Sequence, residues 1–331
     1  MSNRLSIDAA RLYGTIDSLG EVGSFDDPHT GMRGVRRLAL TEADGAGRLH
    51  VIKWMREAGL SVRVDQIGNV FARRAGQNDG LRPVMIGSHI DSVATAGRFD
   101  GCLGVLGGLE IIRTLNDAGF ETLRPLVVAF FTDEEGARFG TDMLGSAVAT
   151  GRITLEDAHA LQDRKGLSVR DELATIGFLG EDDPRLTAPF AYLECHIEQG
   201  PILGASGVEV GVVTGVQGIC WHEVTIVGRS AHAGTTPMSL RADAGVAAAR
   251  INLALRDFVA SKRFGPEFRA TMGMISPYPS LVNVIPGRVI ATVDLRDPDT
   301  ALLDAAEAEA VSYTHLRGPR DRQKSRMPSS A

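Results

Sequence analysis

Three short apolar runs in this chain each lead into a group of histidine or acidic residues. PVMIGS comes before His89, PLVVAFFT before Asp133, and AYLEC before His196. Apolar runs that alternate with helix-like segments are typical of strands in an open α/β sheet. Ligands bind beyond the carboxyl ends of parallel strands in such sheets. We therefore expect these polar groups to converge on one crevice.

The residue types in these groups indicate a metal centre. Imidazole and carboxylate oxygen suit a borderline divalent ion, by default zinc, and also manganese, cobalt or nickel. Two ions about 3.5–4 Å apart need a carboxylate that spans both, and Asp100, in a loop before Gly101, can do that. Asp91 can accept the far ring N–H of His89 and fix its tautomer.

The adjacent pair Glu134 and Glu135 can divide the remaining work. One can bind metal while the other takes a proton from metal-activated water. Each group alone has an ordinary explanation, because H-x-D is more often a surface turn and a Glu-Glu pair is usually a solvated face. Four groups on separate chain segments are harder to explain by surface polarity, and together they predict a two-metal hydrolase.

Composition excludes several other classes of protein. The 331 residues allow two domains, and 44% hydrophobic content suffices for sizeable cores. The net charge of −6, without a basic face before the last twenty residues, argues against a nucleic-acid partner. No apolar run reaches the roughly 18 residues of a membrane span, and MSNRLSIDAARLYG reads as an amphipathic helix, not a signal peptide.

Cysteine usage favours the cytoplasm. Cys102, Cys195 and Cys220 are an odd number of cysteines without C-x-x-C spacing, as expected in a reducing compartment. We predict that they have no chemical role.

Helix and strand patterns alternate through the first part of the chain. Residues 41–59 predict a helix capped by Thr41 and ended by Gly59, and SVRVD and NVFARR predict strands. Residues 101–118 predict a helix whose glycines lack the spacing of a phosphate-binding loop, so close helix-to-sheet packing explains them better. Residues 151–190 predict a broken helical excursion.

The pattern changes near residue 215. CWHEVTIVGR, FRATMGMIS and GRVIATVDLR alternate like half-exposed strands, with a long helix in ADAGVAAARINLALRDFVASK. We therefore predict an α/β protein. Residues 1–214 would form a metal-binding domain with a mainly parallel sheet flanked by helices, and 215–310 a smaller inserted α+β sandwich.

Several segments resemble the dinuclear-metal aminoacylase and carboxypeptidase family, in particular its N-carbamoyl-L-amino-acid hydrolase and allantoate amidohydrolase branch. They are GSHIDSVATAGRFDGCLGVLGGLE, FFTDEEGARF, HIEQGPIL, GRSAHAGTTPM and LVNVIPG. His196 followed by Glu198-Gln199-Gly200 favours this branch over the peptidases. The resemblance implies a hydrolase that cleaves the carbamoyl C–N bond of N-carbamoyl-L-amino acids, or of a ureido acid such as allantoate, with metal-activated water. An aminoacylase, a dipeptidase or an inactive fragment are the alternatives.

The same resemblance implies a role for each matching residue. His89 and His196 would bind one metal, Asp100 would bridge, Glu135 would bind the second metal, and Glu134 would be the general base. In the inserted domain, which would also form a homodimer, His232 would stabilise the oxyanion.

Three further residues would bind the substrate. Asn283 and Arg296 would hold its carboxylate, and Gln199 would contact its amide. On sequence alone, Arg296 can equally form a salt bridge with Asp294 or Asp297, and His232 and Asn283 can be ordinary turn residues.

The end of the chain departs from the resemblance. The family pattern continues beyond residue 331 and includes one more histidine ligand, so both domains are expected to be incomplete. Residues 311–331 (VSYTHLRGPRDRQKSRMPSSA) predict an atypical tail without helical or strand period, and His315 is not expected to be a ligand. With only Asp100 and Glu135, the second metal should bind weakly, which puts activity in doubt.

Overall fold

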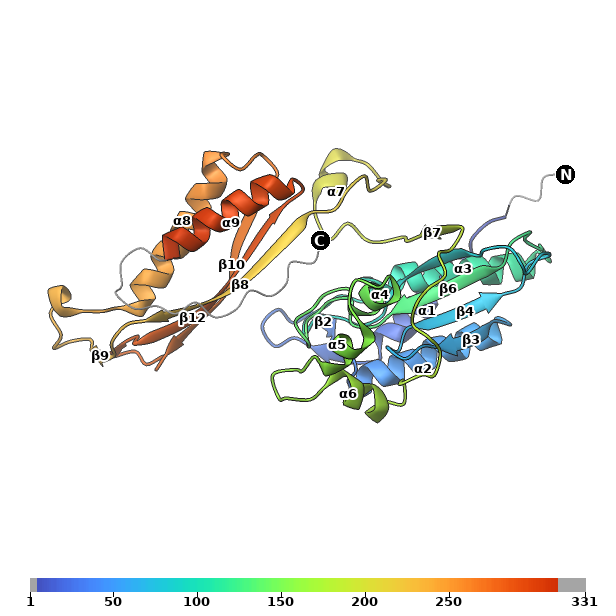
Figure 1. Cartoon of the computed structure of the whole chain (residues 1–331), viewed down its shortest axis with the longest axis horizontal. Helices are drawn as coiled ribbons and strands as arrows, with labels where there is room; N and C mark the ends of the chain where they lie inside the picture. The colour runs from blue at the N-terminus through green and yellow to red at the C-terminus, as the bar shows by residue number, and fades with distance from the viewer. Residues whose placement is uncertain (1–4, 315–331) are drawn as a thin grey trace. The chain divides into compact units, whose positions relative to one another are not determined.

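The computed structural model describes residues 5–314, and the chain divides into two compact units, Met1–Glu209 and Val210–Ala331 (Figure 1). The division falls close to the boundary predicted at residue 214. Most of the predicted tail, including His315, lies outside the described residues. Its first residues continue the last helix to Thr314, so the prediction that 311–314 lack helical structure was wrong. Within the part described, no helix is long and apolar enough to cross a membrane.

The first unit contains a five-stranded mixed sheet in the order β3-β4-β6-β5-β7. β5 pairs in parallel with both β6 and β7, whereas β4 is antiparallel to β3 and to β6. The α/β class is confirmed. Parallel pairing is limited to three strands because a short turn joins β3 to β4, and such a turn allows only antiparallel pairing. The strands are β3 (Ser61–Val64), β4 (Val70–Arg74), β5 (Val84–His89), β6 (Leu126–Phe131) and β7 (Ala191–Leu193).

Three long helices flank this sheet. α2 begins after Thr41, whose hydroxyl accepts a hydrogen bond from the Asp44 amide, and ends before Gly59, which has a φ of 82°. Both predicted ends of this helix are confirmed. The remaining elements are α1 (Ala9–Gly20), β1 (Ser24–Asp26), β2 (Arg33–Val35), α2 (Glu42–Glu57), α3 (Cys102–Asp117), α4 (Leu144–Ala149), α5 (Leu155–Ala160), α6 (Val169–Thr175) and α7 (Ile202–Ser206).

The glycines of α3 allow that helix to lie close to β5. A Cβ atom on Gly104 would lie 2.8 Å from the Ser88 Cβ, and one on Gly108 would lie 3.0 Å from the Ile86 Cγ2. These distances confirm close packing as the reason for the glycines. The contact brings the start of α3, and with it Asp100, next to the end of β5.

The second unit has a three-stranded antiparallel sheet in the order β10-β12-β8, with two helices on one face (Figure 1). Along β12, Val289, Ala291, Val293 and Leu295 are buried, and they alternate with more exposed residues, as the sequence pattern predicted. A two-stranded sheet and a short 3-10 helix complete the unit. The elements are β8 (Gly218–Val227), β9 (Ala231–His232), η1 (Met238–Leu240), α8 (Ala244–Ser261), β10 (Arg269–Tyr278), β11 (Val284–Ile285), β12 (Arg288–Asp297) and α9 (Thr300–Thr314).

Candidate metal centre

His89 is the last residue of β5 and its side chain is buried. Its Nδ1 atom lies 3.0 Å from the main-chain oxygen of Asp91, so Nδ1–H donates there and Nε2 keeps its lone pair in the neutral ring. We predicted that the Asp91 carboxylate would accept this bond. That carboxylate is 3.7 Å away because it turns to accept from the amides of Glu134 and Glu135, each at 3.3 Å.

His196 follows β7, the strand beside β5. Its Nδ1 atom bonds the Ile197 carbonyl at 2.8 Å, which again leaves Nε2 for the site. The rings of His89 and His196 are stacked with centroids 6.0 Å apart. The parallel order β6-β5-β7 therefore brings the two histidines together, as the apolar runs predicted.

Asp100 reaches the site from the loop before α3. Gly101 has a φ of 63°, and a Cβ atom there would lie 2.4 Å from Nε2 of His89. Only glycine both adopts this conformation readily and leaves room for the imidazole. This glycine sets the close approach of Asp100 to His89.

Three side chains offer donor atoms to a common point. The donors of His89, Asp100 and His196 all lie within 4.8 Å of one another. Asp100 Oδ1 is 3.1 Å from Nε2 of His196 and 3.9 Å from Nε2 of His89, and it is a buried oxygen without a hydrogen-bond partner. Donors bound tetrahedrally at roughly 2.0–2.2 Å lie about 3.4 Å apart. The spacing, the unpaired oxygen and the chemistry of the donors fit a divalent metal ion.

The loop after β6 supplies the two glutamates. Asn69 holds this loop, accepting from the Thr132 amide at 3.0 Å and donating to the Gly145 carbonyl at 3.0 Å. Glu134 Oε2 lies 3.4 Å from Nε2 of His89, and Glu135 has a buried carboxylate oxygen without a hydrogen-bond partner.

The site concentrates negative charge in a partly buried place. Burial raises the pKa of Glu134, and it raises the pKa of Glu135 to about 7, with the neighbouring Asp100 and Glu134 carboxylates adding to the shift. The Asp100 carboxylate raises the pKa of His196 to about 9. A bound divalent cation would lower these pKa values, because it would stabilise the ionised carboxylates and the neutral imidazole.

Gln199 also lies at this centre. Its side-chain amide donates to Asp100 Oδ2, and its main chain has a φ of 53°. The predicted contact of Gln199 with a substrate amide therefore stays a prediction, while its contact in the structure holds Asp100.

Sequence reasoning missed Glu194 as a neighbour of this centre. Its two carboxylate oxygens accept from the Ser88 hydroxyl at 2.5 Å and the Tyr192 hydroxyl at 2.8 Å. The signal was present in the sequence, because Tyr192, Glu194 and His196 alternate as residues on one side of an extended segment do.

His232 and Asn283 lie side by side in the second unit. β9 carries His232, which pairs with Val284 of β11, and the Asn283 carbonyl accepts from the Ala233 amide at 2.9 Å. Nδ1 of His232 accepts from the amides of Gly234 and Thr235 at 3.1 and 3.2 Å. The neutral ring therefore carries its proton on the exposed Nε2, where it can donate.

Arg296 lies elsewhere in the second unit, on β12. Its Nε and Nη2 atoms donate to the Asp294 carboxylate at 2.9–3.1 Å, and Trp221 Nε1 donates to the same carboxylate at 3.1 Å. The structure thus contains the salt bridge with Asp294 that the sequence offered as an alternative role for Arg296.

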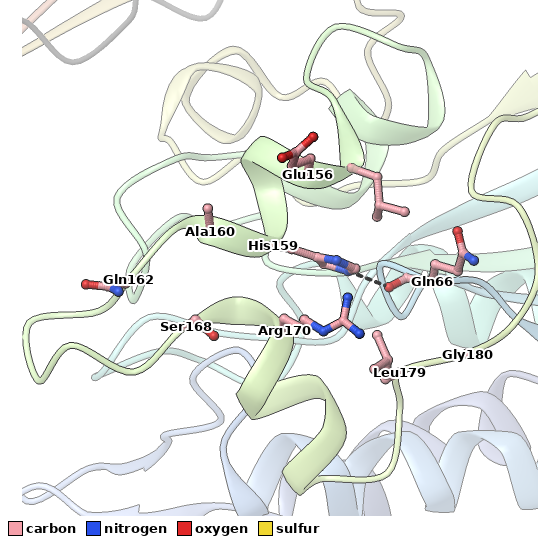
Figure 2. A pocket seen from close by; sticks show the side chains of 10 residues that line it. Gln66, Glu156, His159, Ala160, Gln162, Ser168, Arg170, Leu179 and Gly180 are labelled. Carbon is pink, nitrogen blue, oxygen red and sulfur yellow. Dashed lines mark hydrogen bonds between the residues drawn. The ribbon is translucent and has the colours of Figure 1, made fainter.

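A separate hollow of about 760 Å³ lies on the first unit, lined by residues of α5, α6 and three loops (Figure 2). His159 points across it and bonds the main-chain oxygen of Gln66 at 2.8 Å. The lining includes both Glu156 and Arg170, so its charge does not select one class of ligand. No residue of the metal group lines this hollow.

Comparison with known proteins agrees with this geometry. Residues 85–321 match the model of peptidase family M20/M25/M40. The chain is 47% identical over 302 residues to an "N-carbamoyl-L-amino-acid amidohydrolase" of Rhizobium meliloti, which covers 91% of this chain and 71% of that protein. The chain belongs to peptidase family M20/M25/M40. The family is metal-dependent, and the group of His89, Asp100 and His196 can hold an ion.

Other relatives support the same branch of the family. A "Ureidoglycolate hydrolase" of Arabidopsis thaliana is 36% identical over 310 residues, covering 91% of this chain and 64% of that protein. The crystal structure of an amidase of the hydantoinase/carbamoylase family from Burkholderia vietnamiensis is 43% identical, with a TM-score of 0.85 over 95% of this chain and 74% of that chain.

Proposed function

We propose that this chain is a metal-dependent amidohydrolase that cleaves the carbamoyl C–N bond of N-carbamoyl-L-amino acids. One observation carries the proposal: the donors of His89, Asp100 and His196 lie within 4.8 Å of one another, with Glu134 beside them. The 47% identity to a protein named for this activity supports the substrate class. A related ureido acid, such as the substrate of the ureidoglycolate hydrolases, is the second candidate.

His89, His196 and Asp100 would hold one divalent ion, and Asp100 with Glu135 would contribute to a second. Zinc fits these donors, and so do manganese, cobalt and nickel. A bound ion would supply Lewis acidity, polarising the substrate carbonyl and lowering the pKa of a water molecule. Gln199 would keep Asp100 oriented through its hydrogen bond to Oδ2.

Glu134 would move the proton. As water attacks the carbamoyl carbon, the Glu134 carboxylate accepts the water proton, and it then delivers this proton to the amino-acid nitrogen as the C–N bond breaks. The products are the free amino acid and carbamate, which decomposes to ammonia and carbon dioxide. Asp91 would fix the main chain of Glu134 and Glu135 through its two hydrogen bonds.

The second unit would bind the rest of the substrate. His232 presents a ring N–H that can stabilise the developing oxyanion, and loss of one such donor typically costs about 10²–10³ in rate. Asn283, beside His232, would bind the α-carboxylate, and Arg296, near the other end of β12, would bind it from the second subunit of a dimer. Asp294, which accepts from Trp221, keeps the planar guanidinium of Arg296 in a fixed orientation, which favours two-point recognition of a carboxylate.

The test is the variant Glu134→Gln in the full chain, assayed with N-carbamoyl, N-acyl, dipeptide and ureido substrates in added zinc, manganese or cobalt. We expect bound metal to remain and hydrolysis of N-carbamoyl amino acids to be lost. Glu57→Gln, which changes an exposed glutamate, is the matched control. If Glu134→Gln hydrolysed N-carbamoyl amino acids at the parental rate, Glu134 would not be the general base. Faster hydrolysis of N-acyl or dipeptide substrates by the parent would favour an aminoacylase or dipeptidase.

We also propose that the protein is a cytoplasmic homodimer. Two-fold symmetric dimers are the commonest oligomers, and β8 and β10 are edge strands of the second unit's sheet that a second copy can cover. Its cysteines, Cys102, Cys195 and Cys220, form no disulfide with one another, as in a reducing compartment. Light scattering that finds only a monomer would contradict the dimer.

A further inference from the structure

Arg37 is an arginine whose side chain is almost fully buried, with 1% of its surface exposed. Its guanidinium donates to three main-chain carbonyls and one thiol sulfur. The acceptors are the oxygens of Ile90 at 2.7 Å, Leu19 at 2.9 Å and Val22 at 2.9 Å, and the Cys102 Sγ at 3.1 Å. Burying a guanidinium is costly, so a buried arginine that bonds only neutral acceptors calls for an explanation.

The acceptors of Arg37 belong to segments that carry the metal donors. Ile90 lies between His89 and Asp91, and Cys102 comes two residues after Asp100. The main chain of Arg37 adds two bonds to the first segment, because its amide donates to the Ser92 hydroxyl at 2.9 Å and its carbonyl accepts from the Ser92 amide at 3.0 Å.

The two remaining acceptors, the carbonyls of Leu19 and Val22, link Arg37 to the surrounding core. Leu19 is near the end of α1 and Val22 lies just beyond it, where a cation is favourable. On α2, a Cβ atom at Gly47 would lie 2.8 Å from the Arg37 Cδ, so this glycine leaves the room that the arginine chain occupies.

We propose that Arg37 is a positioning residue for the metal centre, linking the Ile90 peptide to the first turn of α3 so that His89 and Asp100 keep their spacing as ligands. This inference rests on the proposed function, since it assigns Arg37 to that same site. The planar fork of a guanidinium can reach acceptors on three segments at once, which the single ammonium of a lysine cannot. Loss of contacts that orient metal ligands typically costs about 10–100-fold in metal affinity.

If Arg37 only stabilised the fold, replacing it would not be expected to weaken metal binding. Buried ionic groups can often be replaced by apolar side chains of similar volume without loss of stability. Arg37→Met is therefore expected to stay folded but to bind metal more weakly. Arg36→Met is the matched control, because Arg36 is the adjacent exposed arginine, and its Nε donates to the Ala94 carbonyl.

The first experiment measures the zinc dissociation constant of the full chain by competition with a chelator. We expect Arg37→Met to raise it roughly 10–100-fold and Arg37→Lys to raise it by less. Arg36→Met should leave it unchanged. Val51→Ala, which opens the core far from the donors in sequence, should lower Tm and leave the zinc dissociation constant as in the parent.

The second experiment measures amide hydrogen exchange of residues 89–103 in metal-free protein. We expect faster exchange in Arg37→Met and parental exchange in Arg36→Met. Parental exchange, or an unchanged zinc dissociation constant, in folded Arg37→Met would overturn the inference. Should Arg37→Met fail to fold, Arg37→Lys decides by the same two measurements. If the parent itself bound no zinc, the proposed function would fail, and the exchange data alone would decide the role of Arg37.

Discussion

At the scale of single residues, ligand chemistry was readable from the sequence, but hydrogen-bond partners were not. His89, Asp100 and His196 were predicted as donors, and they lie together. The tautomer of His89 is set by a main-chain carbonyl and not by the predicted Asp91 carboxylate. A residue type limits what a side chain can bind, whereas its rotamer depends on its neighbours. The Asp91 carboxylate turns away from His89 to the amides of Glu134 and Glu135, which are distant in the sequence.

Gly101→Ala should disrupt the metal group. The new Cβ would meet the His89 ring at 2.4 Å, and the φ of 63° is strained for alanine by about 1–3 kcal/mol. We expect weaker zinc binding, measured by chelator competition, and a lower free energy of unfolding. Gly107→Ala is the control, because nothing lies within 4 Å of a Cβ there, and it should stabilise α3 by about 0.5–1 kcal/mol. Equal zinc affinity in both variants would contradict the steric argument.

Asp65 should make stability depend on pH. Burial raises its pKa to about 6, even though the carboxylate accepts from the amides of Ile67 and Asn69. Because the folded-state pKa lies above the usual value of 3.8, the folded protein binds the proton more tightly, and this contribution to stability falls as pH rises from about 4 to 6.

Asp65→Asn should remove that contribution. Urea unfolding between pH 4 and 7 should show a free energy of unfolding that declines less with rising pH in the variant than in the parent. Glu57→Gln, at an exposed position, should keep the parental slope. Identical slopes in Asp65→Asn and the parent would show that the pKa is not raised.

At the scale of helices and strands, the site depends on three parallel strands. β6, β5 and β7 are neighbours, so the residues after their carboxyl ends meet at one edge. The apolar runs predicted this convergence, and the helix ends at Thr41 and Gly59 followed from capping rules. Contacts between helices were not predictable in this way. Arg11 of α1 binds Glu110 of α3, and no local sequence pattern predicts this pair.

Arg11→Met should loosen the contact between α1 and α3. The Glu110 side chain is fully buried, and its bond to Arg11 Nη2 is 2.8 Å long. Because Arg11 is 33% exposed, we expect a loss of about 2–3 kcal/mol in urea unfolding, below the cost of breaking a fully buried pair.

Two further variants test this reasoning. Arg11→Met combined with Glu110→Gln should recover part of the loss, since the Glu110 charge no longer remains buried without Arg11. Arg33→Met breaks an exposed pair with Glu21 and should cost less than about 1 kcal/mol. Equal losses in Arg11→Met and Arg33→Met would show that burial of Glu110 is unimportant.

At the scale of the whole molecule, the proposed functional residues fall in two compact units. The first holds the metal donors, and the second holds His232, Asn283 and Arg296. This division means that metal binding and substrate anchoring can be perturbed separately. It also predicts that the two units respond differently to removal of metal.

Chelation should destabilise the first unit selectively. A ligand at about 100 times its Kd stabilises the folded state by about 2.7 kcal/mol. In scanning calorimetry of the full chain, we expect a chelator to lower the transition that belongs to the first unit and to leave that of the second unchanged. His196→Ala should abolish the effect of the chelator. A shift of both transitions, or of neither, would contradict a metal centre confined to the first unit.

The sequence by itself determined the fold class, most helix and strand positions, and which histidine and acidic residues are candidates for a metal group. These depend on local properties: apolar periodicity, caps, turn residues and ligand chemistry. Only the tertiary structure decided the strand order, the carbonyl behind His89, the Asp294 partner of Arg296 and the burial of Arg37. The strand order and the burial of Arg37 depend on contacts between segments far apart in the chain. The partners of His89 and Arg296 are only two residues away, but distant groups orient them: the amides of Glu134 and Glu135 hold the Asp91 carboxylate, and Trp221 holds that of Asp294. Such contacts are selected by packing of the whole unit and not by local pattern.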